Sequence, residues 1–231
     1  MHPIGDAPVT RRPRVFCIGL DKTGTTSFHR AMEMLGYKSL HWGGAESRDA
    51  VRRAYKERKP ILAYLDPTYE AFSNIELIAT KFKLVDRQYP GSLFVYTSRP
   101  VEEWVASRKR HVILNHYKKS IGEYDGDNLI LEEQAWREYF LRHRRRVLKY
   151  FDGRGDFVEL DTAAQSKWEP LCKMLQRPVP TAPYPHSNKI GAAYRKQTLN
   201  EAEAAKIDLK PPGAMRLLYR RFRYFCHDLH Q

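Results

Sequence analysis

The stretch VFCIGLDKTGTTSFHRAM, residues 15–32, decides the fold of this chain. Its first part, residues 15–20, is an apolar run that is typical of a buried strand. A short polar loop follows at 21–27, and apolar residues then recur at helical spacing up to Gly36, a residue that favours the end of a helix. The stretch therefore predicts a strand, a tight polar loop and a helix in succession.

The same alternation continues along the rest of the chain. Further strands are predicted at 37–41, 61–65, 93–97 and 156–160. Helices are predicted at 46–59, at 74–87, from residue 100 onward, and at 129–151, 163–175 and 214–231. A polar loop is predicted at 120–128. Strands that alternate with helices indicate a parallel sheet covered on both faces, so we expect a three-layer α/β fold. Residues 1–13 hold three prolines and no periodic pattern, which predicts a loose arm before a single domain at 14–231.

The composition narrows the classes of protein and of partner. The chain has 231 residues, 42% of them hydrophobic, and 40 Lys plus Arg against 27 Asp plus Glu, a net charge of +13. This excess of positive charge favours anionic partners. No stretch approaches the roughly 20 apolar residues of a membrane span, the first residues lack a signal peptide's apolar core, and the three cysteines are far apart. We therefore expect a cytoplasmic protein without a disulfide framework or a cysteine zinc site.

The loop after the first strand has the composition of an anion cradle. A helix that begins at the carboxyl end of a strand presents free N–H groups and the positive end of its dipole. Gly24 lets the backbone approach an anion closely, Thr25, Thr26 and Ser27 add hydroxyl donors, and Lys22 adds a full charge. These residues predict a site for a phosphate or another oxyanion.

The cradle departs from the ATP-binding pattern G-x-x-x-x-G-K-[ST]. Gly19 and Gly24 have the required spacing, but Thr25 stands where that pattern has its lysine. The strand at 93–97 also leads to a cation rather than to the carboxylate that Mg-ATP chemistry needs. The loop therefore favours an anionic nucleotide without a metal, while an ATP-dependent phosphotransferase stays an alternative.

The run K-T-G-T-T at 22–26 resembles the 5′-phosphosulfate-binding loop of sulfotransferases. Members of that family also carry an arginine at the end of a later strand and a serine eight residues on, which bind the 3′-phosphate of the nucleotide. Arg99 and Ser107 have this order and spacing. The resemblance extends from residue 15 to about residue 189, where PYPHSNK at 183–189 is similar to a late loop of bacterial-type members.

The resemblance implies a P-loop NTPase-like sulfotransferase fold with 3′-phosphoadenosine 5′-phosphosulfate (PAPS) as donor, 3′,5′-ADP as product and no metal. It implies that the donor is bound by Lys22, Thr23, Gly24, Thr25, Thr26, Ser27, Arg99 and Ser107. Many members have an aromatic residue where Ser27 stands, and here Phe28 comes next. The basic loop that closes over the 3′-phosphate in some members has only 189–191 and 195–196 as candidates.

Catalysis in this family moves a sulfuryl group from the donor phosphate to an acceptor hydroxyl or amine. By resemblance, Lys22 stabilises the charge that develops on the leaving phosphate. A base should take the acceptor's proton, and family members place one just after the third strand. Asp66 follows the strand predicted at 61–65 and is preferred, while His41 ends the second strand and is the alternative. His111 and His116 are expected to be solvated.

The acceptor and other partners are less defined by the sequence. An anionic, carbohydrate or lipid acceptor is compatible with the chain, and the basic cluster at 142–146 could receive an anionic one. The basic amphipathic segment at 214–231 could lie on a membrane, although such helices more often dock on their own domain. We expect no specific nucleic-acid partner, and a non-enzymatic polyanion-binding domain is the third alternative.

Overall fold

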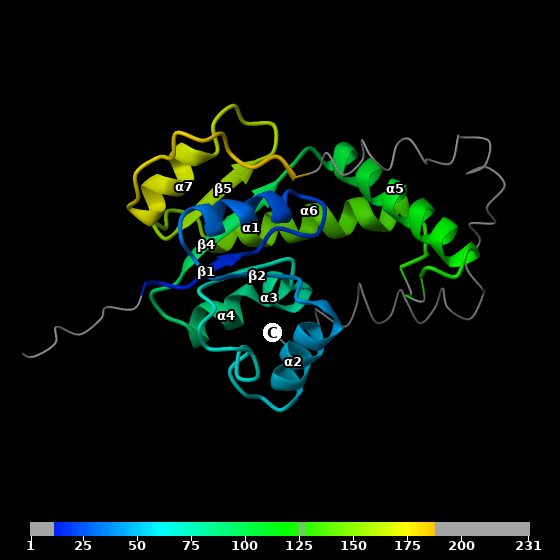
Figure 1. Ribbon diagram of the computed structural model, residues 1–231, viewed down its shortest axis with the longest axis horizontal. Coiled ribbons are helices and arrows are strands. Elements are labelled where there is room, and N and C mark those ends of the chain that lie inside the picture. The colour runs from blue at the N-terminus through cyan, green and yellow to red at the C-terminus, as the bar shows by residue number, and fades with distance from the viewer. Residues whose placement is uncertain (1–11, 125, 127, 188–231) are drawn as a thin grey trace, which may run out of the picture.

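Five parallel strands form the central sheet, in the order β2-β3-β1-β4-β5. The computed structural model describes residues 12–124, 126 and 128–187 (Figure 1). The strands are β1 (Val15–Cys17), β2 (Ser39–His41), β3 (Ala71–Ser73), β4 (Leu93–Ser98) and β5 (Phe157–Asp161). The predicted α/β class with a parallel sheet is therefore confirmed.

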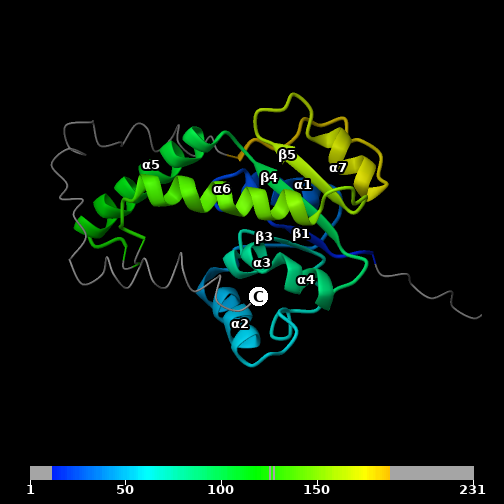
Figure 2. The ribbon, with the colours of Figure 1, turned by 180° about the vertical axis from the view of Figure 1, so that it is seen from behind.

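Helices cover both faces of this sheet. They are α1 (Thr25–Met34), α2 (Gly44–Lys56), α3 (Glu76–Thr80), α4 (Phe82–Gln88), α5 (Val101–Ser120), α6 (Glu133–Tyr150) and α7 (Trp168–Leu175). Successive side chains of a strand point to opposite faces. Accordingly, Val15 and Cys17 pack in one core with α1 and α7, while Phe16 and Ile18 pack in a second core with α2, α3, α4 and α6. Figure 1 shows α1 in front of the sheet, and Figure 2 shows α6 in front of the other face.

A third apolar core joins α5 to α6 beyond the end of β1. Its buried members are Leu20, Trp104, Val105, Val112, Trp136 and Phe140. Both views show the two helices side by side, reaching past the sheet (Figures 1 and 2). Leu20 lies in the loop that follows β1, so this core fixes α5 against that loop.

The strand predicted at 61–65 is wrong, because this apolar run forms turns. Ala63 N–H donates to the Pro60 carbonyl, and the N–H groups of Ile61 and Leu62 donate to the side chains of Gln88 and Tyr89. The segment thus has its polar groups satisfied at the end of α4 and does not pair with the sheet. The third strand is β3, which begins ten residues after the start of that run, and Ser39 to His41 pair with Ala71 to Ser73.

Most of the predicted helices are present with changed bounds. The expected ending at Gly36 is confirmed, since Gly36 adopts a φ of 76° and Tyr37 N–H donates to the Met32 carbonyl. The single helix expected at 74–87 is two helices, α3 and α4, separated by Lys81 with a φ of −101° and a ψ of 31°. The predictions for 1–11, for 189–191 and 195–196, and for the helix at 214–231 lie outside the described residues.

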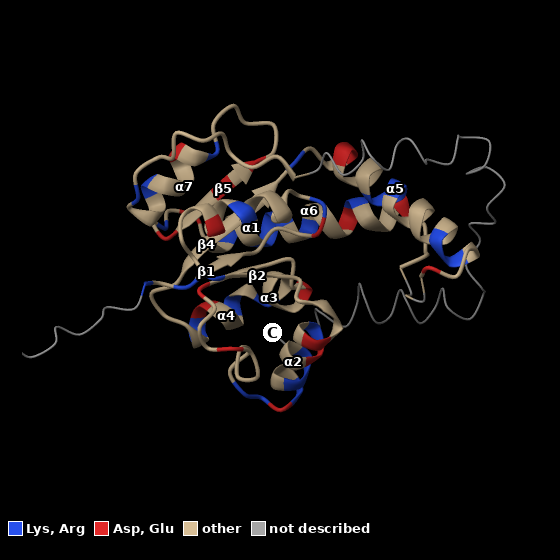
Figure 3. Cartoon of the chain, in the orientation of Figure 1, with Lys and Arg blue, Asp and Glu red and all other residues tan. Residues whose placement is uncertain are grey.

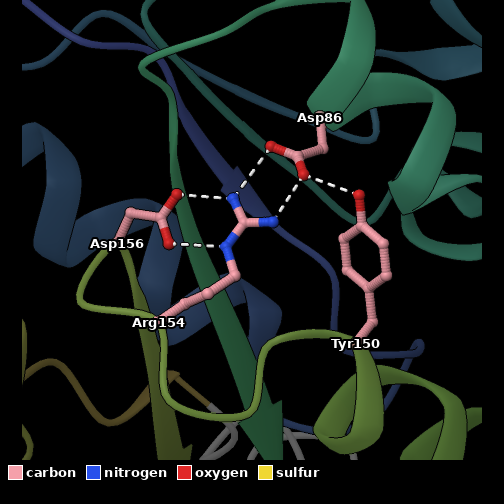
Figure 4. Close-up of polar contacts among 4 residues, drawn as sticks. All are labelled: Asp86, Tyr150, Arg154 and Asp156. Carbon is pink, nitrogen blue, oxygen red and sulfur yellow. Dashed lines mark hydrogen bonds and ion pairs between the residues drawn. The ribbon is translucent and has the colours of Figure 1, made fainter.

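An ion-pair network joins the far ends of α4, α6 and β5 (Figure 4). The Arg154 guanidinium donates to both Asp86 oxygens at 2.6 and 3.0 Å and to both Asp156 oxygens at 2.9 and 2.6 Å. The Tyr150 hydroxyl adds a bond of 2.7 Å to Asp86. These charge-assisted bonds tie the edge strand to the helical layer, away from the carboxyl ends of the strands.

Candidate functional site

The loop between β1 and α1 lies at the carboxyl edge of the sheet. From β1 the chain moves to β2 and β3 on one side, and later to β4 and β5 on the other. The order of the strands therefore reverses beside β1, and such a switch point is where open α/β sheets bind ligands.

Four side chains, three of them from distant elements, hold carbonyl groups of this loop. Four carbonyls between residues 18 and 22 each accept a hydrogen bond from a side chain. The pairs are His143 Nε2 to Ile18 O at 2.8 Å, Thr23 Oγ1 to Leu20 O at 2.6 Å, Trp104 Nε1 to Asp21 O at 2.7 Å and Arg99 Nη1 to Lys22 O at 2.9 Å. In a trans peptide the N–H points away from the C=O. The N–H groups of the following residues are therefore turned away from these four donors.

Gly19 allows the loop to touch the end of β4. A Cβ at this position would lie 2.0 Å from Thr97 Oγ1 and 2.4 Å from the Thr97 carbonyl oxygen. Thr23 is fully buried at the same contact, and its hydroxyl lies 2.8 Å from that of Thr97. The Thr23 side chain thus holds the loop to β4, so a contribution of this residue to ligand binding is limited to its backbone.

Helix α1 begins with the features of an anion-binding terminus. Gly24 is the N-cap residue and adopts a left-handed φ of 95°, which a residue with a Cβ reaches only with strain. Neither a capping side chain nor an acidic residue of the first turn satisfies this end of the helix within the described part of the chain. The positive end of the α1 dipole is therefore not neutralised by its own first turn.

Lys22 carries the central charge of the loop. It adopts a left-handed φ of 66°, which is uncommon for a residue other than glycine. Burial lowers the pKa of its ammonium group, Asp21 opposes this shift, and the charges of Arg108, Arg110 and Arg99 lower the pKa further. Lys22 thus lies in the field of three other cations, and the charge of Asp21 offsets only part of it. An added anion would relieve the repulsion among the cations.

Asp21 and Arg108 form a clamp that the sequence did not reveal. Arg108 Nη1 donates to the two Asp21 oxygens at 2.9 and 3.2 Å, and the side chain of Arg108 is 6% exposed. Its guanidinium lies 5.4 Å from the ring of Trp104 and 5.1 Å from that of Trp136. The partners are 87 residues apart in sequence. The sequence holds one local signal of this clamp, the spacing of Trp104 and Arg108 by one helical turn on α5.

The three predicted hydroxyl donors of α1 point in different directions. Thr25 and Ser27 are buried, and Ser27 Oγ accepts a hydrogen bond of 3.2 Å from the N–H of Ser187. Thr26 is half-buried, and its Oγ1 lies 3.2 Å from His41 Nε2. Thr26 is therefore the member of the trio that is both accessible and paired with another site residue.

His41 lies at the carboxyl end of β2, as predicted. Its Nδ1 lies 2.9 Å from the Ser73 hydroxyl at the end of β3, and its ring stacks on that of His29 at 5.2 Å. Burial, with a smaller contribution from His29, lowers the pKa of His41 to about 4. The imidazole is consequently neutral at pH 7.

Asp66 lies at the opposite edge of the sheet, so the reason for choosing it as the base is wrong. Asp66 Oδ2 accepts a hydrogen bond of 2.8 Å from Lys38, which directly precedes β2, and Asp66 Oδ1 accepts one of 2.9 Å from the N–H of Thr68. The hydrogen bond from Lys38 and those from Thr68 hold the pKa of this exposed carboxyl well below its usual range. Asp66 caps a turn before β3 instead of ending a strand beside the loop.

His111 is half-buried on α5, one turn beyond Arg108, and the expectation that it is solvated is wrong. Burial and the charge of Lys22 are the largest causes that lower its pKa to about 4. His116 is also half-buried, and its Nε2 donates to the Leu129 carbonyl at 2.6 Å. His111 is thus a neutral imidazole within the electrostatic field of the loop.

Arg99 and Ser107 flank the loop from the β4 side. Arg99 follows β4 directly and holds the Lys22 carbonyl, while Ser107 is half-buried on α5. Arg99 Nε is buried and has no hydrogen-bond partner among the residues that the structure describes. Figure 3 shows acidic residues at the first turn of α5 and basic residues along the rest of it. The predicted cations Lys22 and Arg99 are therefore brought together.

A family model for the sulfotransferase domain matches this chain over residues 14–125 and 113–193. The matched segments include the loop, His41, His111 and Arg99. No curated protein matches the chain. No helix among the described residues is long and apolar enough to cross a membrane. The matches cover well over half of the sequence, and the chain belongs to the sulfotransferase domain family.

Proposed function

We propose that this sulfotransferase takes its sulfuryl group from PAPS and transfers it to an acceptor hydroxyl or amine. The observation that carries the proposal is the fixed orientation of the loop, whose carbonyls at residues 18, 20, 21 and 22 are all held by side chains. With the carbonyls held, the backbone offers N–H donors beside Lys22 and the N-terminus of α1. This donor set fits a doubly anionic phosphosulfate.

The two predicted cations, Lys22 and Arg99, bind different phosphate groups of the nucleotide. Lys22 and the first turn of α1 bind the 5′-phosphosulfate, and Arg99 with Ser107 binds the 3′-phosphate. When bound, PAPS supplies an activated sulfuryl group whose transfer leaves a phosphate. Lys22 then stabilises the charge that develops on the leaving group, and it needs no reorientation because the peptide that follows it is tied to Arg99.

His111 is our candidate for the group that accepts the acceptor's proton. Its pKa of about 4 keeps the ring neutral, so that a ring nitrogen can accept a proton at pH 7. No described residue hydrogen-bonds to this ring, whereas both ring nitrogens of His41 are within hydrogen-bond distance of hydroxyls. We expect His111→Gln to lower kcat about 100-fold and to leave 3′,5′-ADP affinity unchanged. His116→Gln on the same helix is the matched control.

Thermal shift measurements test the donor. At a concentration of 100 times Kd, 3′,5′-ADP should stabilise the protein by about 2.7 kcal/mol, which raises Tm by roughly 5–10 °C. Lys22→Ala and Arg99→Ala should remove this shift. Lys38→Ala, which removes an exposed lysine at the opposite edge of the sheet, should retain it.

Two results would contradict the proposal. One is stabilisation by ATP with Mg²⁺ and none by 3′,5′-ADP, which would favour a phosphotransferase. The other is oligonucleotide binding that weakens steeply with salt and is indifferent to both substitutions, which would favour a polyanion-binding domain. A positive result leads to transfer from sulfur-labelled PAPS to a panel of sugars, phenols, lipids and tyrosine peptides.

A further inference from the structure

Three polar side chains from three separate elements form a short hydrogen-bonded chain beside the loop. Thr26 lies in the first turn of α1, His41 ends β2 and Ser73 ends β3. Thr26 Oγ1 lies 3.2 Å from His41 Nε2, and His41 Nδ1 lies 2.9 Å from Ser73 Oγ. His41 and Ser73 are partners in the β2–β3 register, so the pairing of the strands fixes this arrangement.

The hydrogens of this chain can be arranged in two ways. A neutral imidazole has one N–H donor and one acceptor nitrogen. In the first arrangement, Ser73 donates to Nδ1 and the Nε2–H donates to Thr26. In the second, the Nδ1–H donates to Ser73 and Thr26 donates to Nε2. The two arrangements differ in where the hydroxyl hydrogen of Thr26 points.

Burial of Ser73 favours the first arrangement. Ser73 is 1% exposed, and its hydroxyl has no other hydrogen-bond partner among the residues that the structure describes. In the second arrangement the Ser73 hydrogen would be left without an acceptor, which is costly at a buried site. The first arrangement uses every polar hydrogen of Ser73 and His41, and it leaves the Thr26 hydrogen available to a ligand.

An anion at the N-terminus of α1 favours the same arrangement. Thr26 is the second residue of α1, at the positive end of the helix dipole. An oxyanion there accepts hydrogens and is repelled by oxygen lone pairs, so it selects the state in which Thr26 donates to it. Binding therefore shifts the population toward the Nε2–H tautomer of His41.

We propose that His41 is a positioning residue, whose Nε2–H holds the Thr26 oxygen so that the Thr26 hydroxyl donates its hydrogen to the phosphosulfate. This role rests on the proposed donor. It differs from the role of a base, since His41 exchanges no proton with the acceptor. His29 supports the ring by stacking, and is itself held by Ser39 at 2.8 Å and near Glu33 at 3.6 Å.

Nitrogen-15 NMR of the histidine rings tests the tautomer in the unmodified protein. We expect His41, assigned by its loss in His41→Gln, to show a protonated Nε2 and an unprotonated Nδ1 when 3′,5′-ADP is bound. A protonated Nδ1 with an unprotonated Nε2 in that complex would overturn the proposal. The tautomer itself is read in the unmodified protein and without turnover.

A double-mutant cycle with 3′,5′-ADP tests the route through Thr26. By calorimetry, Thr26→Val and His41→Leu should each weaken binding about tenfold, the effect of one lost charge-assisted hydrogen bond. In the Thr26→Val background, His41→Leu should change affinity by less than about twofold. His41→Gln keeps an N–H donor and should recover most of the affinity. Equal losses from His41→Leu in both backgrounds would overturn the proposal.

Turnover separates this role from that of a base. His41→Leu should lower kcat in the wild-type background and leave it unchanged in the Thr26→Val background, whereas loss of a base would lower kcat in both. Failure of the donor assignment is recognised independently, because wild-type protein would then show no binding of 3′,5′-ADP that depends on Lys22. Binding that depends on Lys22, together with an additive cycle, refutes the role of His41 alone.

Discussion

Replacement of Arg108 by methionine tests whether the clamp on Asp21 stabilises the fold. Methionine keeps part of the side-chain packing between Trp104 and Trp136 and removes the guanidinium. The lost bonds to Asp21, at 2.9 and 3.2 Å, are charge-assisted and contribute about 1.5–3 kcal/mol. The guanidinium also lies 5.4 and 5.1 Å from two indole rings. Each of these cation–π contacts contributes about 0.5–2 kcal/mol.

The exposure of Asp21 limits the expected loss. Its side chain is 39% exposed, so water can replace part of what Arg108 supplied. We therefore expect Arg108→Met to lower the free energy of unfolding by about 2–4 kcal/mol. For a domain of this size that corresponds to a fall in Tm of roughly 5–15 °C. Urea denaturation followed by circular dichroism gives the free energy, and a thermal scan gives Tm.

Lys109→Met is the matched control for this experiment. Lys109 is the next residue on α5, 46% exposed, and its pair with Glu133 at 2.7 Å contributes at most about 1 kcal/mol. The reasoning is refuted if Arg108→Met lowers Tm no more than this control does. It is also refuted if the effects of Arg108→Met and Asp21→Asn simply add, because two partners in one interaction are expected to couple.

Three further substitutions test other parts of the description. Gly19→Ala places a Cβ 2.0 Å from a hydroxyl oxygen of β4 and should lower Tm by more than about 6 °C, whereas Gly155→Ala, with no atom within 4 Å, should change it little. Asp66→Asn should leave kcat within about twofold, since its exposed pair lies at the far edge; a drop of 100-fold would restore Asp66 as the base. Arg154→Met should cost about 2 kcal/mol at pH 7. Because the hydrogen bond from Arg154 lowers the pKa of Asp86, this difference should shrink as the pH falls below about 4, and urea denaturation at pH 7 and pH 3 would show it.

The sequence predicted the parts of the site that depend on local signals. The strand, loop and helix of residues 15–34 could be recognised because the apolar run, the glycine and the hydroxyl residues lie within twenty positions. Arg99 could be placed because it follows the clearest strand directly. In both cases the relevant geometry is set by neighbours along the chain.

The error at 61–65 has a physical cause. An apolar run of five residues is compatible with a buried strand or with a turn that fills a core, and periodicity does not separate the two. Ile61 is fully buried, as the pattern implied, but Gln88 and Tyr89 satisfy the N–H groups of the segment. The true strand, β3, has only three residues, and Ser73 weakens its apolar signal.

The remaining site residues depend on contacts between distant segments. Arg108 reaches Asp21 across 87 residues, and His143 reaches the Ile18 carbonyl across 125. His143 lies within the basic cluster at 142–146, yet it is 2% exposed. Such assignments need the packing of α5 and α6 against the end of β1, which one sequence does not specify.

The carbonyl groups held at residues 18, 20, 21 and 22 have a consequence for the energetics of binding. Two of the donors, His143 and Trp104, are buried side chains of α6 and α5, which pack against the end of β1 and its loop, so the loop is part of the cooperative folding unit. Its conformational entropy is lost when the protein folds and not when a ligand arrives. Binding should therefore carry little ordering cost for the loop, and its unbonded N–H groups should exchange rapidly until a bound anion accepts their hydrogens.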